Sequence, residues 1–260
     1  MARTVRRSAK PAQSRIKVHN VPSRGRSTRV LRDGVILHQL SDLETRLEAE
    51  LEWGPDVTVI RSQVDLQLER TEAIAEKLGI RHPRLPVGGR PAIMSTDFYF
   101  EMEVDGQTSR QARAVKPSAA FALKNGCTPS ALKQMVSKLE IERRYWEDEG
   151  VEWRIVTDRN LDRVRAANIR LLLSGQALDP DQGEAFWSQA LEWTAKALAK
   201  GSDWPISHLA KKSEADGKLP EKDFVACIRH LCSLRLLAFD MSQPFTPDLR
   251  ASDFEFGGEA

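Results

Sequence analysis

An alternation of apolar and polar residues before a tight turn predicts a β-hairpin in the middle of the chain. From Thr96 to Val104 every second residue is apolar, which is typical of a half-buried strand. The turn signal Asp105-Gly106 follows, and a second strand is predicted from Arg110 to Lys116. Two paired strands are therefore expected here.

The predicted hairpin brings a carboxylate beside an amine. A loop from Asp105 to Thr108 would put Asp97 directly opposite Lys116, with both side chains on the same face. Pro117-Ser118 ends the second strand just after the lysine, so we expect the pair at the rim of the sheet. Such a pair is an ordinary ion pair on most sheets, but rims of this kind also host metal-dependent chemistry.

The rest of the first 175 residues alternates between extended and helical apolar spacing. Capping residues and glycines mark the helix ends, with Thr128-Pro129 opening the longest helix. Strands are predicted at 28–31, 35–37, 57–59 and 151–155, and helices at 41–53, 69–78, 128–149 and from Asp158 toward Gly175. This order predicts an α/β domain that ends near residue 175.

A second, smaller domain is predicted at 182–260, after a linker at 178–183. Helical spacing recurs up to Gly201, from Pro205 to Lys212 and from Glu221 to Leu234. An alternating segment with two prolines follows. Three helices and a hairpin indicate a winged-helix or helix-turn-helix module.

The composition favours a cytoplasmic protein with no membrane partner. The chain has 260 residues, of which 41% are hydrophobic and 29% charged, and it contains no run of about 18 apolar residues. The N-terminal residues contain no apolar segment of the kind that would indicate secretion. Three cysteines without an export signal are expected to be reduced thiols.

The first 32 residues carry ten basic residues and no acidic one. We interpret 1–20 as a basic flexible arm that cannot fold alone, and expect it to neutralise the phosphates of nucleic acid. A solvated tail without a partner is the alternative. The residues expected to contact the DNA backbone are Lys17, Arg24, Arg26 and Arg29.

Two further carboxylates lie at helical positions where chemistry and structure compete. Glu44 follows Ser41 by three residues, which is the spacing of a capping box. Glu142 falls within the apolar stripe of its helix, and a buried carboxylate needs a partner or a cation. A salt bridge of Glu142 with Arg113 or Lys138 is the structural alternative.

Carboxylates beside a lysine suit phosphodiester hydrolysis. Carboxylates can hold one or two Mg²⁺ ions, which polarise a phosphate and activate water. The lysine would orient that water or stabilise the developing charge. An aspartate and a lysine across a hairpin also recur in unrelated sheets. The spacing therefore leaves both a metal-dependent site and an ordinary ion pair open.

Six separate strings resemble the TnsA family, the endonuclease subunits of heteromeric cut-and-paste transposases. The resemblance covers roughly residues 18–165 and extends more weakly over the C-terminal module. The strings are VPSRGRSTRV (21–30), HQLSDLE (38–44), GIRHP (79–83), MSTDF (94–98), VKPS (115–118) and KLEIERRYW (138–146).

The resemblance implies a restriction-endonuclease-like, PD-(D/E)xK fold for residues 21–175 and a winged-helix-like C-terminal domain. It implies DNA hydrolysis at the 5′ ends of the mobile element, with Mg²⁺ as cofactor and Mn²⁺ able to substitute. The implied partners are transposon-end DNA, an integrase-type (TnsB-like) transposase subunit that processes the 3′ ends, and an AAA+ ATPase (TnsC-like) regulator.

Carried over by position, the resemblance makes Glu44, Asp97 and Lys116 the catalytic residues. Glu44 and Asp97 would also bind metal, and Glu142 becomes a further ligand or a supporting residue. One position departs from the family pattern, because Ala114 stands where a glutamine is expected two residues before the lysine. The missing ligand would then be water, the backbone carbonyl of Val115, or Glu142.

Two rival hypotheses follow from these features. Because Ala114 cannot bind metal, the chain could be a non-catalytic DNA-binding subunit that couples the transposase to its regulator. A stand-alone nuclease of the junction-resolving type is the third hypothesis, against which the basic arm and the second domain argue.

Overall fold

The computed structural model describes residues 28–32, 35–123, 128–175, 178–201 and 203–257. Its contacts divide the chain into two compact units. The first comprises Met1–Thr45 and Pro55–Asn160, and the second comprises Arg46–Gly54 and Leu161–Ala260. The division differs from the predicted domain limits, because α4 (Arg163–Ser174) and most of α1 (Asp42–Trp53) group with the C-terminal helices.

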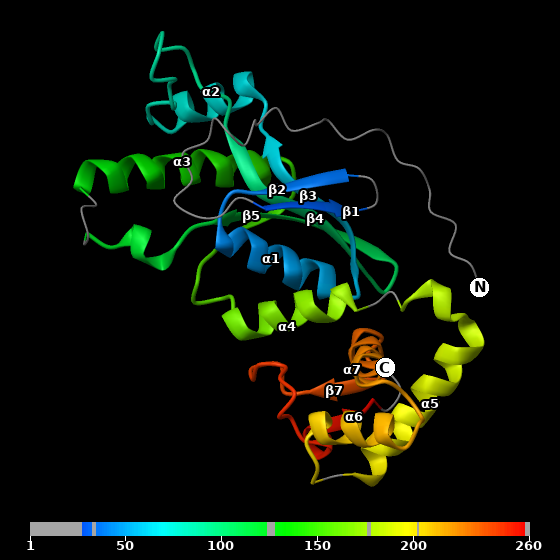
Figure 1. The fold of residues 1–260 in the computed structure, drawn as a ribbon. Coiled ribbons are helices and arrows are strands. Elements are labelled where there is room, and N and C mark those ends of the chain that lie inside the picture. Colours follow the sequence, from blue (N-terminus) through cyan, green and yellow to red (C-terminus); the bar gives the residue numbers. More distant parts are fainter. Residues whose placement is uncertain (1–27, 33–34, 124–127, 176–177, 202, 258–260) are drawn as a thin grey trace. The chain divides into compact units, whose positions relative to one another are not determined.

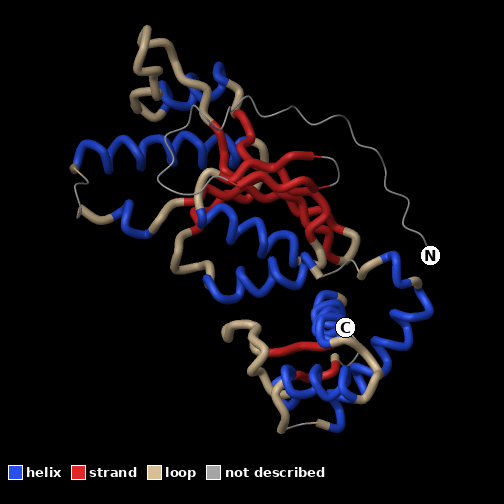
Figure 2. The backbone as a smooth tube through the Cα atoms, in the orientation of Figure 1, coloured by secondary structure: helices blue, strands red, loops and turns tan. Residues whose placement is uncertain are grey.

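The first unit is built on a sheet flanked by helices (Figures 1 and 2). Four strands form this sheet, in the order β3-β4-β5-β6. The first three strands are antiparallel, and β6 pairs with β5 in parallel. A separate antiparallel pair, β1 and β2, precedes them. The bounds are Thr28–Arg32 (β1), Val35–Gln39 (β2), Val57–Asp65 (β3), Ser95–Val104 (β4), Gln107–Val115 (β5) and Glu152–Val156 (β6).

Two helices, α2 (Leu68–Lys77) and α3 (Pro129–Asp148), pack against this sheet. Their buried residues, among them Ile74 and Ile141, share a core with Ala112 of β5. Thr128 caps α3 by accepting a hydrogen bond from the Ala131 amide, with Pro129 in the first turn, as predicted. A short 3-10 helix, η2 (Ser118–Phe121), follows β5.

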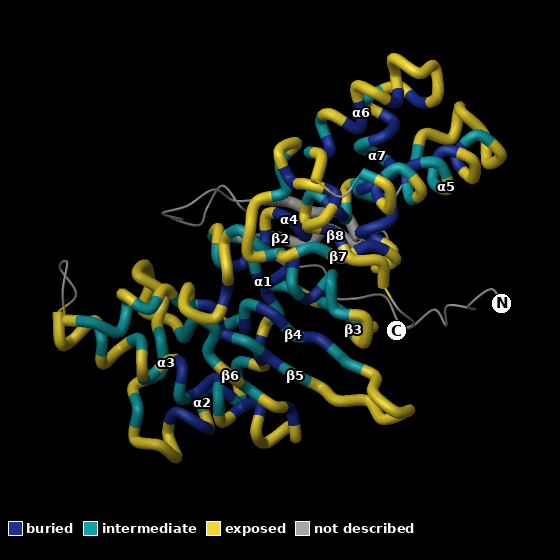
Figure 3. The backbone as a smooth tube through the Cα atoms, turned by 90° about the horizontal axis from the view of Figure 1, so that it is seen from below, coloured by how far each residue is buried: buried dark blue, intermediate teal, exposed yellow. Residues whose placement is uncertain are grey.

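The hairpin of β4 and β5 has a two-residue turn, so the predicted loop from Asp105 to Thr108 is wrong. Val104 pairs with Gln107, and both turn residues have positive φ, 51° at Asp105 and 74° at Gly106. These angles fit a type I′ turn, which matches the twist of the strands. The buried inner part of the hairpin gives way to an exposed tip (Figure 3).

This register also changes the predicted cross-strand pair. The last pair of the ladder is Phe98 with Arg113, and one further step puts Asp97 opposite Ala114. Lys116 therefore lies diagonally from Asp97, two residues beyond the directly opposite position.

Near Asp97 the side chains of β4 stop alternating regularly between the two faces of the sheet. Tyr99 stacks on Trp146 of α3 with ring centroids 5.5 Å apart, and Thr96 accepts a hydrogen bond from the same indole at 2.6 Å. Residues three apart cannot face the same side of a regular strand. At this point the opposite strand, β3, contains Gln63 with a φ of 51°. The chain is therefore irregular where the predicted site begins.

The second unit contains α4, α5 (Glu184–Lys200), α6 (Ile206–Ala215) and α7 (Glu221–Ser233), followed by β7 (Leu237–Phe239) and β8 (Phe254–Phe256). The two strands pair antiparallel, and two 3-10 helices, η3 (Pro180–Gln182) and η4 (Ala251–Asp253), lie before α5 and β8. The core gathers Phe224 and Ile228 of α7 with Ile206 and Leu237. These elements agree with the predicted helices and hairpin, whereas the winged-helix assignment stays a prediction.

The cap of α4 differs from the prediction. Asp162, not the predicted Asp158, caps α4 by accepting from the Arg165 amide at 2.7 Å. Asp158 instead accepts hydrogen bonds from the amide and hydroxyl of Ser118. None of the helices in the described ranges is long and apolar enough to cross a membrane.

Candidate active site

The site begins where β4 and β5 stop pairing with each other. There the Asp97 carboxylate takes the place of a ladder partner, because its Oδ2 accepts the Val115 amide at 2.6 Å. The same oxygen accepts the Lys116 ammonium at 3.0 Å, and Lys116 also donates to the Val115 carbonyl at 2.8 Å. The strand ends therefore hold the carboxylate, the amine and a backbone carbonyl together.

Glu44 reaches this cluster from the first turn of α1. Its amide donates to the Ser41 hydroxyl, and its carboxylate accepts from that hydroxyl and from the Leu40 amide, both at 2.9 Å. One bond of the predicted capping box, from the Glu44 amide to the Ser41 hydroxyl, is thus present, whereas the carboxylate accepts from the Leu40 amide instead of the Ser41 amide. The Glu44 carboxylate nevertheless turns inward as well, since the residue is only 6% exposed.

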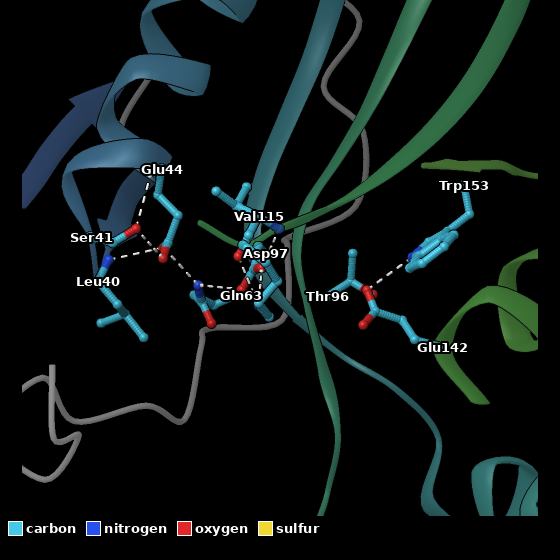
Figure 4. A network of polar contacts seen from close by, with 10 residues as sticks. Leu40, Ser41, Glu44, Gln63, Thr96, Asp97, Val115, Glu142 and Trp153 are labelled. Carbon is cyan, nitrogen blue, oxygen red and sulfur yellow. Dashed lines mark hydrogen bonds and ion pairs between the residues drawn. The ribbon is translucent and has the colours of Figure 1, made fainter. Parts of the chain in front are cut away.

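Gln63 connects the two carboxylates, and sequence analysis missed it. Its side-chain nitrogen donates to Glu44 Oε2 at 3.0 Å and lies 3.5 Å from Asp97 Oδ1 (Figure 4). The residue is 4% exposed. Its positive φ costs on the order of 1–3 kcal/mol for a residue other than glycine. No sequence signal predicts that angle, and the strand predicted at 57–59 ended before Gln63.

The cluster has the electrostatics of a cation site. Burial, and next the negative charge of Asp97, raise the pKa of Glu44 above its ordinary value. Burial alone would lower the pKa of Lys116, but the charge of Asp97 and the hydrogen bond to it outweigh this effect and raise the pKa. The two carboxylates therefore repel each other, while the Lys116 ammonium pairs with Asp97 and only partly offsets the repulsion at Glu44. Additional positive charge would stabilise this arrangement.

Glu142 belongs to a neighbouring network. It accepts hydrogen bonds from the Thr96 hydroxyl at 2.9 Å and the Trp153 indole at 3.1 Å. Figure 4 shows this group and the Asp97 group on the two sides of the strand that carries both Thr96 and Asp97. Burial, and next the charge of Asp97, raise the pKa of Glu142 to about 7. Arg113, the salt-bridge partner considered above, pairs with Glu152 instead.

The donors at this site fit a hard cation that keeps several waters. Glu44 and Asp97 offer carboxylate oxygens, Val115 a carbonyl, and Gln63 an amide. Within the described ranges, no three side chains of His, Cys, Asp or Glu form a ready metal cage. The side chain of Ala114 supplies no donor atom to a metal ion. Mg²⁺ suits such a sparse set, because it is commonly bound by one or two carboxylates and water.

Comparisons with known proteins show the family of the chain. The sequence model described as TnsA-like endonuclease N terminal matches residues 54–158. Transposon Tn7 transposition protein TnsA of Escherichia coli is 38% identical over 232 residues, which cover 88% of this chain and 80% of that protein. The chain belongs to the TnsA family.

Membership of the TnsA family supports a nuclease that is a subunit of a transposase. It also agrees with the mixed α/β architecture of the first unit. The matched segment contains Gln63, Asp97, Lys116 and Glu142, and it begins after Glu44.

The structure describes the side chains of none of the four residues that are expected to bind DNA. Lys17, Arg24 and Arg26 lie outside the described residues. Arg29 belongs to β1, but its side chain is not described. Their role in this TnsA-family chain stays a prediction.

Proposed function

We propose that this chain is a metal-dependent DNA endonuclease that cuts the 5′ ends of a mobile element, on the strand that is not transferred. An integrase-type transposase subunit would process the 3′ ends. One observation carries the proposal: Asp97, near the start of β4, is hydrogen-bonded to Lys116 and linked through Gln63 to Glu44. Family membership adds the expectation of a nuclease in a transposase.

The proposed ligands of Mg²⁺ are Asp97, Glu44 and the Val115 carbonyl, with Mn²⁺ able to substitute. A cation bound there would polarise the scissile phosphate and make water more acidic. Glu44 and Asp97 would hold the cation beside the phosphate, and Glu44 could alternatively accept a proton from water.

Lys116 is assigned to charge stabilisation. Because its pKa is raised, the amine stays protonated at neutral pH and cannot serve as a base. Its ammonium can orient water and stabilise negative charge that develops on the phosphate. Glu142 is proposed to strengthen cation binding beside Asp97, from the adjacent network, through its negative charge.

The test is strand cleavage by the reconstituted complex with transposon-end DNA and Mg²⁺. Asp97→Ala should abolish cutting at the 5′ ends, and Lys116→Ala should slow it at least about 100-fold. Glu103→Ala is the matched control, since Glu103 is exposed on the same strand. Nicking that survives both site variants would refute the assignment.

Ala114 favours one alternative, a non-catalytic subunit that binds DNA and couples the transposase to an AAA+ regulator. The C-terminal unit, proposed to be winged-helix-like, would contact that regulator in either case. A complete complex that requires this chain for transposition but leaves 5′ ends uncut with Mg²⁺ and Mn²⁺ would establish the alternative. Cleavage by the purified chain alone would favour a stand-alone nuclease.

A further inference from the structure

We propose that Gln63 is a ligand of the cation at this site, supplying through its amide oxygen the donor that Ala114 lacks. The inference rests on the proposed metal-dependent function and adds a residue to it. Three observations carry it: the place of Gln63 in the sheet, the partners of its amide group, and its backbone conformation.

The position of Gln63 follows from the strand registers. Ser62 pairs with Phe98 and Val64 with Thr96, so Gln63 faces Asp97 between these two pairs. On the other side of Asp97, the register of β4 and β5 places Ala114. Asp97 is thus flanked by an alanine on β5 and an amide side chain on β3.

The partners of the amide define the space that a cation would take. The Gln63 nitrogen lies 3.0 Å from Glu44 Oε2 and 3.5 Å from Asp97 Oδ1, between the two carboxylates. A group that donates to both carboxylates occupies the point where their negative potentials add, which is also where a cation is most stable. A cation between them would displace the NH₂ group.

Displacement need not remove Gln63 from the site. The two ends of an amide have nearly the same shape, and the terminal torsion of glutamine is broad and roughly two-fold. A half-turn about this torsion would replace the NH₂ group with the carbonyl oxygen. Amide oxygens are hard donors of the kind that Mg²⁺ and Mn²⁺ accept.

The backbone holds the side chain in this place. Gln63 has a φ of 51° inside a strand, and it is buried. Such a conformation persists only where the surroundings impose it, and it occurs preferentially at ligand-binding and active sites. A glutamine that merely filled space would not require it.

The proposal is tested by titrating the full-length chain with Mn²⁺ and measuring the bound ion by electron paramagnetic resonance. Gln63→Ala should weaken Mn²⁺ binding about 10- to 100-fold. Spin-echo modulation in D₂O should then count one more bound water than in the wild type, because water replaces the amide oxygen. Gln63→Glu, which keeps the size and one oxygen, should bind Mn²⁺ more tightly than the wild type.

Controls separate this inference from the proposed function. Gln107→Ala, at an exposed position of β5, should bind Mn²⁺ like the wild type. Equal binding by the wild type and Asp97→Ala would mean that the metal site itself is wrong. If only Asp97→Ala loses binding, and Gln63→Ala keeps the wild-type water count, the ligand role of Gln63 is overturned while the site stands. Thermal melts show which variants are folded, and Gln63→Glu remains informative if Gln63→Ala is not.

Discussion

Replacing Glu142 by glutamine should stabilise the first unit at neutral and alkaline pH. Glu142 is 6% exposed, and the hydrogen bonds from Thr96 and Trp153 both end on its Oε1. A glutamine can accept both bonds with its carbonyl oxygen. Its amide also matches the protonated carboxyl in shape, and it carries no charge to bury.

The magnitude and sign follow from the pKa. Burial and the charge of Asp97 raise the pKa of Glu142 from 4.5 to about 7 in the folded chain. A carboxyl with a raised pKa favours folding fully below about pH 4.5, and this contribution is lost as the pH rises through about 7. At about 1.4 kcal/mol per pH unit, the loss amounts to about 3 kcal/mol.

The assay is urea unfolding of the wild type and Glu142→Gln between pH 5 and 8 without divalent ions, followed by tryptophan fluorescence. The variant should gain stability relative to the wild type as the pH rises, by about 3 kcal/mol at pH 8. Glu140→Gln is the matched control, because Arg143 lowers the pKa of Glu140, so this variant should lose stability at pH 8. A stability difference between Glu142→Gln and the wild type that does not change with pH would refute the reasoning.

Three further substitutions test other parts of the structure. Thr96→Val keeps the shape of a fully buried residue but removes the hydroxyl that forms hydrogen bonds with Glu142 and Trp146. The free energy of unfolding in urea should fall by about 3 kcal/mol, and a fall below about 0.5 kcal/mol would contradict this reasoning. Lys116→Met should slow strand cleavage by the reconstituted complex about 100- to 1,000-fold, and a loss smaller than about threefold would exclude a role for the ammonium. Asn168→Ala removes hydrogen bonds to the carbonyls of Met241 and Gln243 and from the Phe245 amide. The second unit should lose about 3 kcal/mol of its free energy of unfolding. Protease resistance of residues 240–245 equal to that of the wild type would argue against this prediction.

The hairpin shows what the sequence could predict and where it stopped. The alternation and the Asp105-Gly106 turn predicted both strands correctly. The predicted loop length was wrong. With the observed two-residue turn, the residue opposite Asp97 is Ala114 and not Lys116. The ion pair survives this change because the strands part at Phe98, which leaves the lysine free to reach the carboxylate diagonally.

Gln63 could not be found by pattern, for a physical reason. Hydrophobic periodicity reports which face a side chain takes only while the backbone stays regular. The positive φ of Gln63 is fixed by its surroundings, which are assembled from α1, β3 and β4 and are therefore distant in sequence. Asp158 failed as a predicted cap for a similar reason, because Ser118, 40 residues earlier in the chain, occupies its carboxylate.

The irregularity at Asp97 explains how Glu142 can affect the site without contacting it. Adjacent residues of β4 join separate networks: Thr96 bonds Glu142, and Asp97 bonds Lys116. The charge of Asp97 still raises the pKa of Glu142, so the two carboxylates repel each other. Linkage then requires that a cation beside Asp97 lower the pKa of Glu142, and that an ionised Glu142 in turn strengthen cation binding. A carboxylate that destabilises the folded chain by about 3 kcal/mol at neutral pH is thus understandable as part of the electrostatics of the proposed nuclease centre.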